Sequence, residues 1–71
     1  MSAWKAGEVQ WFDLMTGEGM IIDKDDGSSY YVHYSAIESK EKFKKLERGQ
    51  SVKFQLYENL YMKQVDKIKE V

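Results

Sequence analysis

Aromatic side chains gather in two short segments of the chain, and they are the residues best suited to do chemistry. The first segment is Val9-Gln10-Trp11-Phe12, and the second is Tyr30-Tyr31-Val32-His33-Tyr34-Ser35-Ala36-Ile37. Rings that face solvent can stack on flat partners such as unpaired bases, whereas the same rings turned inward fill a core. The choice between a binding surface and a core depends on which way the strands turn these rings.

A glycine-punctuated apolar segment, Thr16-Gly17-Glu18-Gly19-Met20-Ile21-Ile22, lies between the two clusters. In order, spacing and residue type, the three segments resemble the bacterial cold-shock domain, whose pattern runs Val-Lys-Trp-Phe-Asn, Lys-Gly-Phe-Gly-Phe-Ile and Val-Phe-Val-His-Phe-Ser-Ala-Ile. The resemblance is strongest over residues 7–37, returns over residues 43–54 and is poor after residue 56. It implies an all-β fold: a five-stranded antiparallel Greek-key barrel of the oligonucleotide-binding (OB) type.

Five rings of this chain fall on positions that stack bases in the family that it resembles. They are Trp11, Tyr31, His33, Tyr34 and Phe43. The alternation of a polar His33 with Val32 on one strand favours an outward face for the histidine. Met20 stands where the family has a ring, and its flexible, polarizable side chain can keep part of that contact. These six residues form the predicted nucleic-acid-binding site.

The chain also departs from the family pattern around the second segment. Glu18 and Met20 replace two rings, Thr16 replaces a lysine, and Gln10 stands where a second lysine is usual. At about 1–3 kcal/mol per stacking ring, two lost rings weaken binding by roughly 2–6 kcal/mol if their effects add. We therefore expect weaker binding, an altered base preference or a shorter footprint than in a typical relative.

Alternation and turn residues predict the elements that position the site. Strands are expected at residues 6–12, 19–24, 29–34, 51–57 and 60–68, with turns at 25–28 and 58–59. Strict alternation groups Trp11 with Val9, whereas the resemblance puts the tryptophan outside and the valine inside, so a β-bulge is expected between them. Ser35-Ala36-Ile37-Glu38 has the form of a capping box and predicts a helical turn. Tyr30 replaces a smaller inward valine of the family, so the barrel interior or rim should be remodelled.

Seventy-one residues make one small domain, residues 1–71, with a net charge of −1. Residues 1–39 hold seven carboxylates and two lysines, whereas residues 40–71 hold nine cations and five carboxylates. An acidic total argues against binding through phosphate neutralisation alone but leaves stacking on single strands open. No cysteine, signal peptide or apolar run of membrane-spanning length is present, so we expect a cytoplasmic protein without membrane contact.

Catalytic and metal-binding patterns receive little support, and we expect no enzyme, metal, cofactor or small-molecule substrate. His33 is the single histidine and has no cysteine partner for a zinc site. Asp23, Asp25 and Asp26 lack the rest of a calcium loop and are interpreted as turn formers and solubilising charge. The basic residues of 40–48 and the alternating Lys63, Lys67 and Lys69 could contact phosphates, but an ordinary solvated surface is the alternative.

Two functions from different classes remain. The first is binding of single-stranded RNA or DNA, and the family implies an RNA chaperone that affects transcription or translation. The alternative is a protein-interaction module on the same barrel that has lost useful nucleic-acid affinity, which Gln10, Glu18, Met20 and the acidic first half favour. A monomer is the expectation, with self-association through exposed rings as the other possibility.

Overall fold

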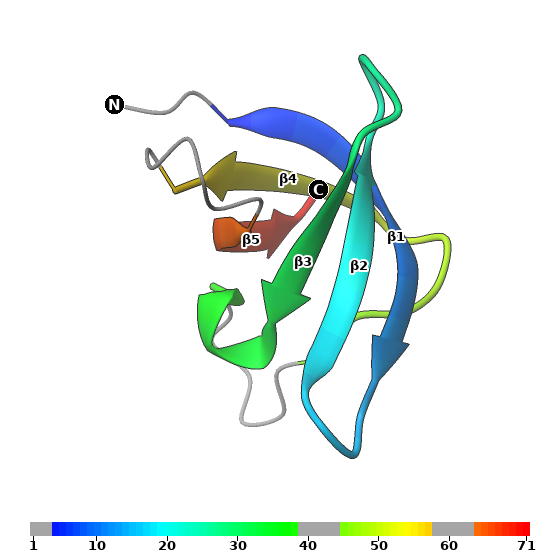
Figure 1. Cartoon of the computed structure of the whole chain (residues 1–71), viewed down its shortest axis with the longest axis vertical. Coiled ribbons are helices and arrows are strands. Elements are labelled where there is room, and N and C mark those ends of the chain that lie inside the picture. Colours follow the sequence, from blue (N-terminus) through cyan, green and yellow to red (C-terminus); the bar gives the residue numbers. More distant parts are fainter. Residues whose placement is uncertain (1–3, 39–44, 58–63) are drawn as a thin grey trace.

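The structure is a computed structural model that describes residues 4–38, 45–57 and 64–71. Within these ranges the chain forms β1 (Lys5–Asp13), β2 (Glu18–Asp23), β3 (Ser29–His33), a 3-10 helix η1 (Tyr34–Ala36), β4 (Ser51–Leu56) and β5 (Val65–Glu70). The strands make one antiparallel sheet in the order β3-β2-β1-β4-β5. Figure 1 shows β1, β2 and β3 curling across β4 and β5.

Two isolated parallel bridges bring the ends of this sheet together. Tyr31 pairs with Gln64, and Ile37 pairs with Ile68, so the β3 side of the sheet meets β5. Closure leaves fewer strand edges open, as in OB-type barrels. The predicted all-β, five-stranded OB-type fold is confirmed.

Strand β1 belongs to both halves of the barrel because it bends in the middle. Its beginning, Lys5 to Glu8, pairs with β4, and its pairing with β2 continues to Asp13. The register with β2 shifts between Val9 and Trp11, which is the predicted bulge. The extra residue leaves Val9 buried and turns Trp11 outward, so the conflict between strict alternation and the resemblance is resolved as expected.

Alternate residues of the strands fill a small apolar core inside the barrel. Its buried members are Val9, Ile21, Val32, Ile37, Leu46, Val52, Phe54, Val65 and Ile68. Tyr30 packs against this cluster while remaining half-buried, and its ring centroid lies 5.9 Å from that of Phe54. The extra aromatic volume therefore sits at the rim of the barrel. Phe12 is likewise half-buried against the core.

The observed element bounds differ from the predicted ones mainly at the ends. β1, β2 and β3 lie within one residue of their predicted limits, and β4 ends one residue early. The last strand begins at Val65 and runs on to Glu70, so its predicted end at Ile68 is wrong. The turn expected at 58–59 lies outside the described residues. A helical turn follows β3 as predicted, but its N-cap is His33, whose side chain accepts a hydrogen bond from Ser35 N–H, and not Ser35 itself.

Asp23, at the end of β2 before the turn to β3, was predicted to be a turn former and a solubilising charge, and the second part of this prediction is wrong. Its carboxylate is fully buried, so it is a turn former but contributes no solubilising charge. Oδ1 accepts the Asp25 N–H at 2.8 Å, and Oδ2 lies 3.3 Å from the Lys5 ammonium. These bonds supply the partners that a buried carboxylate requires. The hydrogen bond to Asp23 and its negative charge raise the pKa of Lys5 above the usual value.

Asp26 completes the same turn from the solvent side. One of its carboxylate oxygens accepts the Ser28 N–H at 2.8 Å. Because this hydrogen bond favours the ionised carboxylate, it lowers the pKa of Asp26. Gly27 adopts a φ of 76°, which completes the reversal at little steric cost.

Candidate nucleic-acid interface

Three of the predicted site residues form a row across neighbouring strands. Trp11 on β1 pairs with Met20 on β2, and Met20 pairs with Tyr31 on β3. Directly paired residues in antiparallel strands project from the same face of a sheet. The bulge is what makes this row possible, because it brings Trp11 into register with Met20. We call Trp11, Met20 and Tyr31 the central row.

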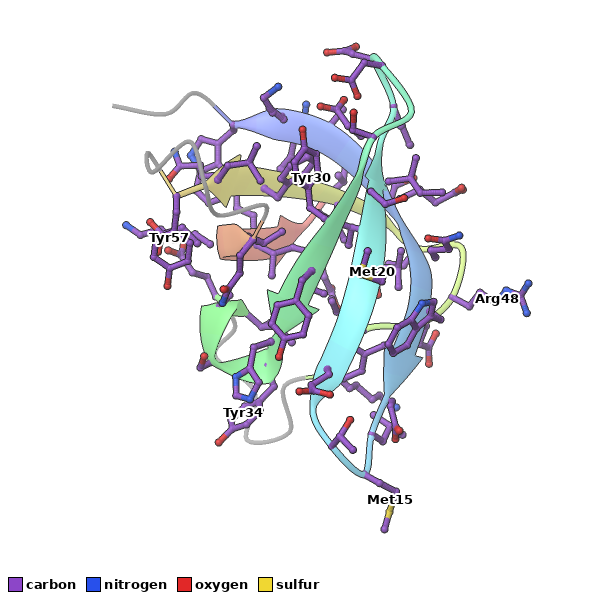
Figure 2. The ribbon with its side chains drawn as sticks, viewed as in Figure 1. Met15, Met20, Tyr30, Tyr34, Arg48 and Tyr57 are labelled. Carbon is purple, nitrogen blue, oxygen red and sulfur yellow. The ribbon has the colours of Figure 1, made fainter. Side chains whose placement is uncertain are left out.

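A second pair lies beside the central row, nearer the β1–β2 loop. Glu18 on β2 pairs with His33 on β3, and Asp13 on β1 pairs with Glu18 from the other side. Figure 2 shows Met20 on the face of β2 that is turned toward the viewer. The same face therefore carries aromatic, thioether and imidazole groups, together with the carboxylates of Asp13 and Glu18.

The side chains on this face are accessible to solvent. Trp11 is 46% exposed, Met20, Tyr31 and His33 are partly exposed, and none of them belongs to the buried core. Several accessible aromatic rings on one face are the feature that single-strand binders use to stack bases. Thr16 and Gln10 stand where the family pattern has lysines, so these two positions supply no cation to attract a phosphate.

Glu18 is joined to Tyr31 by a hydrogen bond across the two strands. The Tyr31 hydroxyl donates to Oε1 of Glu18 at 3.1 Å. Partial desolvation raises the pKa of Tyr31, and the hydrogen bond to Glu18 raises it further. The phenol therefore remains a protonated donor throughout the physiological pH range, and it orients the carboxylate.

Tyr34 lies apart from the central row, at the start of η1 beside the β1–β2 loop. It is 50% exposed, and its ring centroid is 4.5 Å from that of His33. Figure 2 shows it below the end of β3. His33 is held in place by its Nδ1, which lies 2.9 Å from the Ser35 hydroxyl and accepts the Ser35 N–H. Tyr34 therefore extends the accessible ring surface around the end of the sheet.

A groove of about 540 Å³ opens next to Tyr34. Its lining comes from β1, the β1–β2 loop, η1 and the segment before β4: Phe12, Leu14, Met15, Thr16, Gly17, Tyr34 and Lys45. Leu14 and Met15 were missed by sequence reasoning, although they are 68% and 93% exposed. Two consecutive apolar residues in a segment predicted to be a loop were the signal that could have found them. Figure 2 shows Met15 pointing away from the barrel at the tip of this loop.

The remaining predicted contacts are only partly described. Phe43 lies outside the described residues, as do Lys40, Lys42, Lys44 and Lys63. Lys45 and Arg48 are both exposed, with the Lys45 ammonium 3.9 Å from Oε1 of Glu47. Lys69 lies with its ammonium 4.2 Å from the centroid of the Trp4 ring, so this member of the predicted basic stripe already has an aromatic partner.

The described part of the chain has neither a cluster of metal-ligating side chains nor a helix that could span a membrane. Residues 4–38, 45–57 and 64–71 contain no group of three or more histidine, cysteine, aspartate or glutamate side chains placed to hold a metal ion. No helix in these ranges is long and apolar enough to cross a membrane.

Comparison with known proteins identifies the family of the chain. Residues 5–70 match the family model of the "'Cold-shock' DNA-binding domain". The chain is 50% identical to a cold shock-like protein of Thermotoga maritima over 52 residues, covering 73% of this chain and 76% of the relative. It is 41% identical to cold shock-like protein CspLB of Listeria monocytogenes over 64 residues, covering 90% and 94%. The chain therefore belongs to the cold-shock domain family of nucleic-acid-binding proteins.

Proposed function

We propose that this protein binds single-stranded RNA or DNA by stacking unpaired bases on Trp11, Tyr31, His33 and Tyr34, with Met20 between the first two. The observation that carries the proposal is the central row, in which an indole, a thioether and a phenol project from paired positions of three adjacent strands. Adjacent strands lie about 4.8 Å apart, so the row presents a continuous apolar surface to successive bases. Phe43 is included as a sixth contact on the strength of its match to the family pattern.

The proposed mechanism is preferential binding of the open strand, with no covalent chemistry. Each stacked base contributes about 1–3 kcal/mol, and a paired base cannot offer its faces to the rings. Binding therefore shifts the equilibrium of a nucleic-acid hairpin toward its unpaired form. This is the activity of an RNA chaperone, and through it the protein would affect transcription or translation. Residues 1–71 act as one unit in the cytoplasm in this proposal.

A second candidate function is a protein-interaction module on the same barrel. The exposed Leu14 and Met15 beside the groove favour it, since apolar residues at a loop tip suit contact with another protein. Glu18 favours it as well, because a carboxylate on the ring face repels phosphate. The two candidates differ in whether oligonucleotides bind at all.

Titration with a thymidine heptamer separates the two candidates. In a Trp4→Phe variant, Trp11 is the remaining tryptophan and its fluorescence reports on the central row alone. We expect saturable quenching that weakens as salt is raised, since each phosphate neutralised adds about 0.7 to the salt slope for single strands. Unchanged fluorescence at high micromolar oligonucleotide would favour the interaction module.

A double substitution, Tyr31→Ala with His33→Ala, tests whether binding occurs at this face. We expect quenching to be lost while the thermal midpoint stays close to that of the parent. Tyr57→Ala is the matched control, because Tyr57 is 41% exposed but lies at the end of β4, away from the central row. If the double variant unfolds, these rings support the core and the site assignment is wrong. Opening of a fluorophore-labelled hairpin by the parent protein, and not by the double variant, tests the chaperone activity.

A further inference from the structure

Glu18 is an exposed carboxylate beside the central row, between Asp13 of β1 and His33 of β3. Along β2 it lies two residues from Met20 of the central row. The family pattern has an aromatic residue at this position, so the stacking role of that residue is absent here. A carboxylate has no aromatic ring on which a base can stack, and as a hydrogen-bond acceptor it recognises the donor groups of a base.

The hydrogen bond from Tyr31 places this carboxylate for recognition. Oε1 accepts the Tyr31 hydroxyl at 3.1 Å, which restricts the rotation of a long and otherwise mobile side chain. Oε2 has no hydrogen-bond partner among the residues that the structure describes. A base stacked against the Tyr31 ring would bring its edge toward these oxygens, each of which has lone pairs available.

The four bases differ in what their Watson–Crick edges offer to a carboxylate. Guanine presents two adjacent donors, N1–H and the N2 amino group, whose parallel arrangement matches the two oxygens of a carboxylate. Uracil and thymine present one N–H between two carbonyl oxygens, which repel the negative charge. Adenine and cytosine present an amino group beside an acceptor nitrogen. Unpaired bases are read on these edges in single-stranded complexes, and hydrogen bonds to an ionised acceptor are among the stronger ones.

We propose that Glu18, oriented by Tyr31, is a specificity residue that selects an unpaired guanine next to the ring surface. The proposal rests on the proposed single-strand binding and adds a base preference to it. A bidentate contact discriminates between bases by about tenfold or more in affinity. The same carboxylate weakens binding to every strand through repulsion of phosphates, so specificity for guanine is gained as general affinity is reduced.

Affinities for heptamers that differ in one base test this proposal. A thymidine heptamer is compared with heptamers in which one guanine occupies each position in turn, which leaves no guanine run to form other structures. We expect at least one guanine position to bind about tenfold more tightly than the thymidine heptamer. Replacing that guanine by inosine, which lacks the N2 amino group, should remove most of the gain, whereas 7-deazaguanine, which keeps both donors, should retain it.

Two variants assign the preference to Glu18. Glu18→Gln should bind the thymidine heptamer more tightly than the parent and lose the guanine preference, because one of its two acceptors becomes a donor. Glu8→Gln removes the same charge from an exposed position of β1, opposite Ile22, and should keep the preference. A parent that binds all heptamers equally, or a preference that survives in Glu18→Gln, would overturn this inference while leaving single-strand binding intact. Absence of binding to every heptamer would instead refute the proposed function.

Discussion

The ring of Tyr34 lies against the backbone of Gly17. The Gly17 carbonyl accepts the Tyr34 N–H at 2.8 Å, and a Cβ atom added to Gly17 would lie 2.5 Å from Cδ1 of the tyrosine ring. Gly17 also adopts a φ of 72°, in the region that favours glycine. The β1–β2 loop and the start of η1 therefore fix each other, and together they form two walls of the groove.

Substitution of Gly17 tests this relationship. Gly17→Ala introduces strain of about 1–2 kcal/mol at the positive φ and also displaces the Tyr34 ring. We expect a larger loss of unfolding free energy in urea than strain alone produces, together with weaker oligonucleotide binding. Gly27→Ala is the matched control, because Gly27 has a φ of 76° but a Cβ added there would meet no atom within 4 Å. Equal losses of stability and unchanged binding in both variants would contradict a role for the contact.

Because of the Lys5–Asp23 pair, we expect the free energy of unfolding to fall as the pH rises into the alkaline range. Because Asp23 raises the pKa of Lys5, the folded state holds the proton more tightly, and the resulting stability is present below the usual pKa of 10.5 and lost as the pH rises through the folded value. Lys5→Met should therefore be less stable than the parent at neutral pH, with the difference narrowing above pH 10.5. Thermal midpoints measured across this range check the expectation.

Lys24→Met provides the control for that series. The Lys24 ammonium donates to the neutral Ser51 hydroxyl at 3.0 Å, and within the described ranges it has no buried carboxylate as a partner. Its substitution should leave a smaller stability difference at neutral pH. A Lys5→Met curve that runs parallel to the parent at every pH would show that the pair contributes nothing through its charges.

For Asp26 we expect the free energy of unfolding to fall as the pH is lowered into the acid range. The Ser28 N–H lowers the pKa of Asp26, so its stabilising contribution is present above the usual value of 3.8 and lost as the pH falls through the folded value. Asp26→Ala should be less stable than the parent at neutral pH and approach it below pH 3.8. Urea midpoints between neutral and acid pH measure this. Asp25→Ala, in which the Asp25 N–H still reaches Asp23, is the variant against which the Asp26→Ala difference is compared.

Lys45 predicts a salt effect on binding. It lines the groove together with Tyr34, so a strand passing over the tyrosine would bring a phosphate near its ammonium. Lys45→Gln should lower the salt slope of oligonucleotide affinity by about 0.7, the value for one phosphate contact on a single strand. Arg48→Gln is the control, because Figure 2 shows Arg48 pointing away from the barrel on the other side. Equal slopes for all three proteins would support the ordinary solvated surface.

The sequence was sufficient to predict the fold and the outward face of the central row. Strict alternation and the family resemblance gave different orientations for Trp11. The bulge that reconciles them is present between Val9 and Trp11. Local patterns were less reliable where the deciding partner lies far along the chain. Asp23 has the neighbours of a solvated turn residue, but its ammonium partner Lys5 is 18 positions away and is brought close only by strand pairing.

The capping residue and the Glu18–Tyr31 bond were missed for related reasons. Ser35 and Glu38 have capping-box spacing, yet the 3-10 helix has its N-cap two residues earlier, at His33, whose side chain accepts the Ser35 N–H. Glu18 looked like a repulsive substitution because its hydrogen-bond donor, Tyr31, is 13 positions away on another strand. Spacing along a sequence predicts alternation well, but it does not give the pairs that sheet register creates.

Tyr31 also joins the ring face to the C-terminal strand. Its backbone pairs with Gln64, immediately before β5, while its side chain belongs to the central row. A base stacked on this ring would therefore stabilise the backbone pairing of Tyr31 with Gln64, which closes the barrel. Binding of an oligonucleotide should then also stabilise β5. Amide hydrogen exchange at Val65 and Ile68 should slow when an oligonucleotide binds. Unchanged protection there would mean that the contact closing the barrel is not coupled to binding. The contact that closes the barrel is thus coupled to base stacking on its outer surface.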